Sequence, residues 1–292
     1  MSKFVLFCIA TTVVLWASTT VGIRKVATEF PPFQLLFLRF AIASIALLPV
    51  AFFSRIRLPG KKDFWRIGIT AIVGIGICNV CLNVGLRIMG SATASFIVST
   101  GPIFVAILSV LFLKEKISIP GWIFIFISFS GIGIILIGEN GRLQFTPGIF
   151  FVLLAAISQA VYIVFQKPLF AKYSSIEIIC YSIWIVTLAM IPFEWESIGR
   201  LNNVKKPILF AVVYLGVFPG SVAYLAWGLV LSRVLASRAA PFLFIVPFFS
   251  ILIGYFWLHE LPKPLAIAGG IVITLGLTLF YRSEIKQNHE YE

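Results

Sequence analysis

Acidic residues are scarce in this sequence, and none is expected in the middle of a hydrophobic run. Aspartate and glutamate together number 11, against 23 lysines and arginines, so the formal net charge is +12. Every acidic residue falls in an expected loop or close to the end of an expected membrane span. Proton-driven transporters commonly use a buried Asp or Glu as a proton relay, and this sequence offers no obvious residue for that role.

Histidine and cysteine are also rare, and their positions argue against metal or redox chemistry. His259 lies at the end of a hydrophobic run and His289 lies in the C-terminal tail. Cys78 and Cys81 have C-x-x-C spacing, but they fall inside a hydrophobic run without a second pair. No phosphate-binding glycine loop, nucleophile elbow or zinc signature occurs in a usable context. We therefore expect no catalytic residues, no metal site and no cofactor.

Hydrophobic residues, by contrast, dominate the chain. They make up 60% of it, only 12% is charged, and the mean hydropathy is +1.04. A soluble domain is usually about 45–50% apolar and about 25% charged. The composition predicts an all-α membrane protein, because lipid offers no partner to unpaired backbone groups. Nucleic-acid binding is not expected, since it would need a basic face on a soluble module.

Ten segments have the roughly 20-residue length that a membrane-spanning helix needs. The first is interpreted as a retained span, because its apolar run is longer than that of a secretory signal. The expected spans are residues 4–23, 33–53, 65–84, 94–113, 119–138, 147–166, 176–194, 208–231, 239–258 and 264–281.

The distribution of basic residues predicts the orientation of these spans. With the N-terminus in the cytoplasm, 14 lysines and arginines lie on the cytoplasmic side and 8 on the other. Cytoplasmic loops carry an excess of these residues, and residues 55–66 contribute most to it. We expect both termini in the cytoplasm, residues 195–207 outside, and residues 283–292 as a polar cytoplasmic tail.

The two halves of the sequence match each other after a shift of 143 residues, or of 145 further along. The matched pairs include Trp16 with Gln159, Arg24 with Lys167, Pro49 with Pro192, Leu86 with Leu231, Pro102 with Pro247, Glu115 with Glu260 and Gly131 with Gly276. Apolar composition alone would not align prolines and a glutamate. We predict two five-helix repeats, residues 1–140 and 145–282. An odd number of spans per copy makes the repeats inverted, the architecture of many secondary transporters.

Two features inside the expected spans indicate a binding site. Arg39 lies within the second span, where an arginine at mid-bilayer costs roughly 2.5–3.5 kcal/mol on insertion scales. It either faces an interior cavity and meets an anionic substrate group, or reaches the outer interface or braces a carbonyl or Glu29. Pro102 and Pro247 interrupt matching spans, and such interruptions point to a transporter's binding site. A static packing kink is the alternative, so their gating role is a hypothesis.

Polar and aromatic side chains cluster on the same spans. In lipid such groups turn inward, either to hold helices together or to line a cavity. For a single residue the first role is the more common one, but for the set a cavity is the better interpretation. The candidate substrate-binding residues are Trp16, Thr19, Arg39, Asn79, Asn83, Ser95, Ser99, Gln159, Tyr162, Tyr224 and Trp227.

Taken in order, these motifs resemble the drug/metabolite transporter superfamily, specifically proteins with two EamA-type domains. The motifs are Leu15-Trp16-Ala17-Ser18, Pro31-Pro32, Leu38-Arg39-Phe40, Pro102, Leu113-Lys114-Glu115-Lys116, the segment 155–162, Pro247 and Leu258-His259-Glu260. The sequence departs from the family where Ala17 follows Trp16, where Gln159 replaces an apolar or aromatic residue, and where Ser182 stands opposite Arg39 in the repeat.

The resemblance implies ten helices in two inverted sets of five, in the bacterial inner membrane, with alternating access around a central cavity. It implies a small-molecule substrate, amino acids or related compounds, and export as the leading direction. The alternatives are an importer or exchanger of the same fold, for a substrate such as S-adenosylmethionine, or a membrane protein without transport activity.

Overall fold

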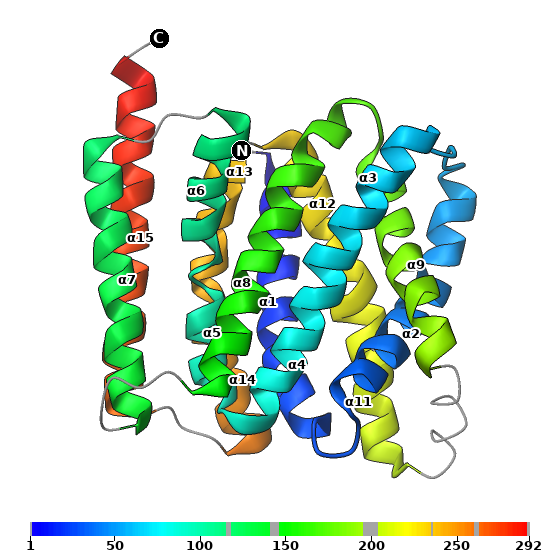
Figure 1. Cartoon of the computed structure of the whole chain (residues 1–292), viewed down its shortest axis with the longest axis horizontal. Helices are drawn as coiled ribbons and strands as arrows, with labels where there is room; N and C mark the ends of the chain where they lie inside the picture. Colours follow the sequence, from blue (N-terminus) through cyan, green and yellow to red (C-terminus); the bar gives the residue numbers. More distant parts are fainter. Residues whose placement is uncertain are drawn as a thin grey trace.

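The computed structural model describes residues 2–114, 118–140, 146–194, 204–234, 236–259 and 263–290. Within these ranges the chain is mostly helical, with short connections, and contains no strand. Figure 1 shows a bundle in which most helices run from one end of the molecule to the other. The two chain ends lie at the same end of the bundle (Figure 1). Glu115, Glu260 and most of the expected outer loop, residues 195–203, lie outside the described residues.

The helices of the first half of the chain extend to residue 140. They are α1 (Lys3–Val26), α2 (Pro32–Phe53), α3 (Lys61–Ala71), the π-helix η1 (Ile72–Ile77), α4 (Cys78–Ile88), α5 (Ser91–Val98), α6 (Gly101–Leu113) and α7 (Ile119–Asn140).

The helices of the second half follow the same order. They are α8 (Pro147–Gln166), the 3-10 helix η2 (Lys167–Ala171), α9 (Ser175–Glu194), α11 (Lys206–Val217), the π-helix η4 (Phe218–Val222), α12 (Ala223–Arg233), α13 (Ala236–Ala239), the 3-10 helix η5 (Ala240–Ile245), α14 (Val246–Leu258) and α15 (Pro264–Glu290). The segment expected to be a tail is therefore helical up to Glu290.

Seven helical stretches are long and apolar enough to cross a membrane, and three further apolar helices in the described part are shorter. All ten expected spans fall on helical stretches. Large apolar side chains are exposed on the outside of the bundle, as with Phe53 at 81% and Phe126 at 78%. Polar Arg39 and Asn83, by contrast, are each only 1% exposed. Apolar outside and polar inside is the distribution that a lipid environment requires, so the chain is a multi-pass membrane protein.

Local features recur at matched positions in the two halves. The π-helices η1 and η4 overlap after a shift of 145 residues, and both interrupt a long helix. Helices α6 and α14 end in the left-handed conformation, at Lys114 (φ 57°) and His259 (φ 55°). Such an ending pairs the last carbonyl groups of a helix. The same backbone irregularities therefore occur twice.

A positive side chain stabilises a helix end in each half. Nη1 of Arg24 donates to the carbonyl oxygen of Leu86 (2.9 Å), at the end of α4. Nζ of Lys167 donates to the carbonyl oxygen of Leu231 (2.6 Å), at the end of α12. Cations at a helix C-terminus pair with its free carbonyls and its negative dipole end. The matched pairs Arg24/Lys167 and Leu86/Leu231 thus reproduce one contact in each half.

Helices α7 and α15 pack against each other through reciprocal glycine contacts. A Cβ atom at Gly131 of α7 would lie 2.6 Å from the carbonyl oxygen of Gly269. A Cβ atom at Gly276 of α15 would lie 3.0 Å from the carbonyl oxygen of Phe124. Gly269 and Phe124 are themselves 145 positions apart, so each helix presents the same surface to the other. This is the contact pattern of a two-fold relation.

Two hydrogen bonds join residues to their own sequence counterparts. Oγ of Ser44 and Oγ1 of Thr187, 143 positions apart, are 2.8 Å from each other. Nδ2 of Asn79 donates to the hydroxyl of Tyr224, 145 positions away, at 3.2 Å. A residue touches its counterpart only near the axis that relates two copies. These two bonds therefore link the two halves of the chain at matched positions.

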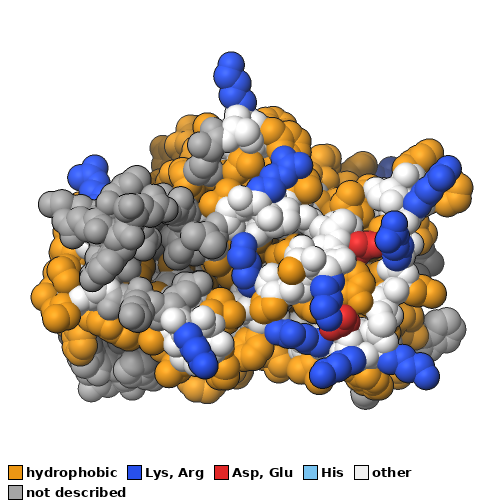
Figure 2. Space-filling view, turned by 90° about the horizontal axis from the view of Figure 1, so that it is seen from above, with side chains coloured by type: hydrophobic (Ala, Val, Ile, Leu, Met, Phe, Trp, Pro, Cys, Tyr) orange, Lys and Arg blue, Asp and Glu red, His pale blue; other side chains and the backbone are white. Residues whose placement is uncertain are grey.

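The end of the bundle that carries both chain termini is rich in basic side chains. Figure 2 shows lysines and arginines spread over this face, with few acidic groups between them. Here Nζ of Lys172 forms an ion pair with Oδ2 of Asp63 at 3.2 Å. Oε1 of Glu177 accepts from the backbone N–H of Arg57 (2.8 Å). Both contacts tie the first half to the second.

The glycine contacts give a prediction for stability. Gly131→Ala and Gly276→Ala should each lower the melting temperature of the protein in detergent, because the added methyl group meets backbone atoms that cannot move aside. Overpacking of this kind typically costs about 1–3 kcal/mol. Gly68→Ala is the matched control, since its added Cβ would have its nearest neighbour at 3.7 Å, the flexible end of Ile185. Equal melting temperatures for all three variants would contradict the packing described here.

Candidate functional site

A cavity lies between the two halves of the chain, near the middle of the bundle. Its empty space, open solvent included, is about 750 Å³. Both halves line it, from α1, α2, α4, α5 and α6 on one side and α8, η4, α12, η5 and α14 on the other. Nine of the residues singled out from the sequence are in its wall: Trp16, Thr19, Arg39, Asn79, Ser95, Ser99, Pro102, Gln159 and Tyr224.

Breaks in two matching spans bring the chain to this cavity. Helix α5 ends at Val98 and α6 begins at Gly101, with Pro102 in the first turn of α6. In the other half the 3-10 helix η5 leads into α14, with Pro247 in its first turn. Proline suits a first turn because its missing N–H would be unpaired there in any case. Each proline thus lies at the start of a helix, at an interruption of the span, and does not kink the middle of an α-helix.

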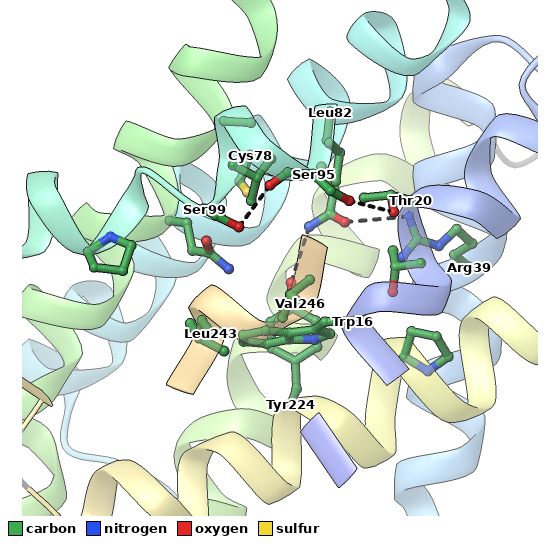
Figure 3. A pocket seen from close by; sticks show the side chains of 17 residues that line it. Trp16, Thr20, Arg39, Cys78, Leu82, Ser95, Ser99, Tyr224, Leu243 and Val246 are labelled. Carbon is green, nitrogen blue, oxygen red and sulfur yellow. Dashed lines mark hydrogen bonds between the residues drawn. The ribbon is translucent and has the colours of Figure 1, made fainter. Parts of the chain in front are cut away.

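Among the described residues that line the cavity, Arg39 supplies the one positive charge. Its guanidinium is 1% exposed and donates from Nη1 to Oδ1 of Asn79 at 3.4 Å, a long hydrogen bond. Nε of Arg39 has no hydrogen-bond partner among the described residues. The side chain therefore reaches neither the outer interface nor Glu29. Figure 3 shows Arg39 at one side of the cavity, next to Thr20.

Asn79 connects the arginine to the second half of the chain. It accepts from Arg39, and its Nδ2 donates to the hydroxyl of Tyr224 (3.2 Å) and to the carbonyl oxygen of Ile75 (2.9 Å). The Tyr224 ring meets Trp16 edge to face, at 5.7 Å between ring centroids. Trp16 crosses the cavity beside Tyr224, with Arg39 to one side and Leu243 to the other (Figure 3). The guanidinium of Arg39, the amide of Asn79 and the rings of Trp16 and Tyr224 thus lie close together in the cavity wall.

Hydroxyl groups join three helices on another side of the cavity. Oγ of Ser95 lies 2.7 Å from Oγ of Ser250 and 3.0 Å from Oγ1 of Thr20. Ser250 also donates to the carbonyl oxygen of Ala17 (2.9 Å). Ser99 donates to the carbonyl oxygen of Ser95 (2.8 Å). These hydroxyls hold α1, α5 and α14 together, and their hydrogen-bonding capacity is largely used within the protein.

Gln159 offers a different kind of polar group to the cavity. It is half-buried, lines the wall, and makes no hydrogen bond to any described residue. Its Oε1 approaches Gly101, the first residue of α6, where an added Cβ would lie 3.5 Å away. A free amide supplies both a donor and an acceptor, so Gln159 is available to a polar group of a ligand.

Four of the expected site residues do not line the cavity. Asn83 donates to the carbonyl oxygen of Pro32 (3.0 Å) and is 1% exposed, so it joins α4 to the start of α2. Tyr162 is buried against the backbone of Gly74 in η1. Trp227 packs behind Trp16, at 5.6 Å between ring centroids. Pro247 is buried beside Val246, which does line the cavity. These residues support the wall from behind.

The rest of the wall had no clear sequence signal. It consists of Thr20, Cys78, Leu82, Val98, Ala155, Pro219, Leu243 and Val246. Apolar residues inside apolar spans look alike whether they face lipid, a neighbouring helix or a cavity. The exceptions are Thr20, a hydroxyl one turn beyond Trp16 on the same helix face, and Pro219, a proline inside an expected span.

The described residues provide no catalytic or metal-binding set. No group of three or more His, Cys, Asp or Glu side chains in the described ranges is placed to hold a metal ion. All four cysteines are buried free thiols. The cavity wall contains hydroxyls, amides, aromatic rings and one guanidinium, but no carboxylate or imidazole. Groups of these kinds are suited to bind and orient a solute.

Comparison with known proteins relates both halves of the chain to transporters. The EamA-like transporter family matches residues 3–137 and again residues 146–282. The chain is 34% identical to an uncharacterized transporter, YdfC, of Bacillus subtilis (strain 168), over 94% of this chain and 90% of that protein.

Two further relatives have names that include a substrate. A probable terminal-alkyne amino-acid exporter of Streptantibioticus cattleyicolor is 29% identical, over 96% of this chain and 94% of that protein. An S-adenosylmethionine uptake transporter of Rickettsia conorii is 27% identical, over 92% of this chain and 90% of that protein. The two names differ in both substrate and direction of transport.

Proposed function

Because the chain belongs to the EamA-like transporter family, we propose that it is a secondary transporter that moves a small organic metabolite across the bacterial inner membrane by alternating access. The observation that carries this proposal is the central cavity, which is lined by both halves of the chain and holds a single buried cation. Family members and relatives are transporters and not enzymes, and the wall has no acid/base set that would suggest otherwise.

Ten membrane crossings in two inverted repeats, residues 1–140 and 145–282, are part of this proposal. The reciprocal contacts of Gly131 and Gly276 support it, as do the hydrogen bonds between Asn79 and Tyr224 and between Ser44 and Thr187. Inverted repeats place the substrate near the bilayer midplane, between interrupted helices. Rocking of one half against the other would then expose the cavity to each side in turn.

Export of an amino acid or a related compound is the direction and substrate class that we propose. The 29%-identical relative named as an amino-acid exporter supports it. An importer or exchanger with this fold is the alternative, supported by the relative named for S-adenosylmethionine uptake. We expect downhill or exchange transport, because the described cavity wall has no carboxylate to serve as a proton relay.

Counterflow in liposomes tests the proposal. The purified protein is reconstituted in vesicles loaded with a mixed metabolite pool, and the entry of single labelled metabolites is followed. We expect saturable entry of at least one amino-acid-sized solute, dependent on an internal pool of the same solute. Entry that never saturates would indicate a pore, and chemical conversion of a membrane component would indicate an enzyme.

Orientation gives a second experiment. We propose that both termini and the basic loop of residues 55–66 face the cytoplasm, because basic residues collect there. Gly60→Cys, in a protein whose four native cysteines are replaced, should react with a membrane-impermeant thiol reagent only after the cells are opened. Labelling of position 60 in intact cells would overturn the ten-span arrangement.

The helix breaks give a third experiment. Pro102→Ala and Pro247→Ala should each slow transport several-fold while leaving expression close to normal. Proline in a helix interior costs about 3 kcal/mol, so it keeps the helix from continuing across the break, whereas alanine would allow it to continue. Pro120→Ala is the matched control, since Pro120 also occupies the first turn of a helix, α7, but neither it nor an adjacent residue lines the cavity. Full transport rates in both test variants would leave these prolines a purely structural role.

A further inference from the structure

The charge of Arg39 is not balanced by any described residue. Its guanidinium is 1% exposed, Nε has no partner, and Nη1 makes one long hydrogen bond to the neutral amide of Asn79. Arginine stays protonated in proteins and carries five N–H donors in a planar fork. Most of this donor capacity is therefore unused. Buried charges are normally paired, so the site calls for an anion that the protein does not supply.

The residues around the guanidinium of Arg39 limit which kind of anion can bind there. Asn79 and Thr20 lie beside it, and the nearby aromatic groups are Trp16, Phe40 and Tyr224. None of these carries a charge. One guanidinium balances one negative charge, and its planar fork matches the two oxygens of a carboxylate. A doubly charged phosphate group would leave one negative charge unmatched.

Away from Arg39 the wall is largely apolar. Trp16 lies between Arg39 and Leu243, and Val246 is beside Trp16 (Figure 3). Val98 and Pro102 complete the apolar side. Gln159 is a neutral polar group in the wall that lacks a protein partner among the described residues. A ligand that satisfies this cavity has an anionic end at Arg39 and an apolar body over Trp16.

We infer that Arg39 determines substrate specificity, and that the cavity takes solutes with one carboxylate and an apolar or aromatic body, as a monoanion or a neutral zwitterion. This inference rests on the transport function proposed above. The amino group of a zwitterion would meet the carbonyl oxygen of Gln159. Solutes with a net positive charge, S-adenosylmethionine among them, are disfavoured because no described residue of the wall balances a second cation.

The two halves of the chain contribute differently to binding of the anion. The counterpart of Arg39 after a shift of 143 residues is Ser182, which is buried and uncharged. The cavity therefore has one anion-binding end, although both halves build it. The carboxylate of the substrate stays with the first half of the chain during the transport cycle.

Matched sets of ligands test the inference on the unmodified protein. Each set shares one body and comprises an amino acid, the acid without its amino group, and the amine without its carboxylate, such as phenylalanine, 3-phenylpropanoate and 2-phenylethylamine. Sets with branched and with linear aliphatic bodies complete the panel. Ligands that bind the folded state raise the melting temperature. We expect the two carboxylate-bearing members of at least one set to raise it, and the amine to have no effect.

Variants of Arg39 add a second readout. Arg39→Gln should weaken binding of the carboxylate-bearing ligands by about tenfold or more, and Arg39→Lys should weaken it less, because lysine keeps the charge but loses the fork. Arg87→Gln is the matched control, since Arg87 is exposed at the end of α4. If Arg39→Gln does not fold, the melting temperatures of the unmodified protein with the ligand sets still test the inference.

The outcomes separate this inference from the proposed function. Counterflow together with equal binding of amines and acids would overturn the role of Arg39 and leave the transporter standing. Failure of every set to bind, in a protein that exchanges other solutes, would overturn the substrate class. Absence of any counterflow would count against the transport function itself.

Discussion

A polar group that faces lipid has no water to bond with, so each polar side chain in the membrane must find its partner inside the protein. Under this constraint large apolar side chains cover the outside of the bundle, and buried polar side chains pair with one another inside it. Phenylalanines such as Phe53 are exposed, while Asn79, Asn83 and the hydroxyls of Thr20, Ser95 and Ser250 are buried and bonded across helices. The same constraint makes the unbalanced guanidinium of Arg39 conspicuous, because it is the buried charge that the rest of the cavity leaves unmatched.

Close helix contacts give the bundle its second organising feature. Gly131 and Gly276 let α7 and α15 approach until backbone atoms touch. Gly216 does the same for α11, where an added Cβ would lie 2.8 Å from the carbonyl oxygen of Arg39. Glycine at such contacts replaces the hydrophobic driving force that lipid removes. The backbone around Arg39 is thereby held by the second half of the chain, while its side chain faces the cavity.

Two hydrogen bonds of Asn79 connect Arg39 in the cavity to the contact between the two halves of the chain. Asn79 belongs to the first half and Tyr224 to the second, and the bond between them lies next to Arg39. In the proposed function, an anion that engages Arg39 would compete with its contact to Asn79, the residue that is also bonded to Tyr224. The cavity and the contact between the halves thus share the same few side chains.

Much of the architecture was readable in the sequence. Long apolar runs predicted the spans, and the matched prolines and glycines predicted that the halves would repeat, because both signals depend on neighbours along the chain. Arg39, Asn79 and Gln159 were recognisable as polar residues in apolar surroundings, which lipid forces inward. The sequence did not separate them from Asn83, Tyr162 and Trp227, which also turn inward but support the wall.

That separation depends on which neighbour each helix face meets, and only the tertiary structure decides it. Tyr162 is covered because Gly74 of η1 leaves room for its ring. Leu243 and Val246 line the cavity at the place where the 3-10 helix η5 is followed by α14. The residues of the chain by themselves determined that it is a helical membrane protein, and they predicted two repeats. Packing between distant helices decided where the cavity lies, because a wall is built from side chains far apart in sequence.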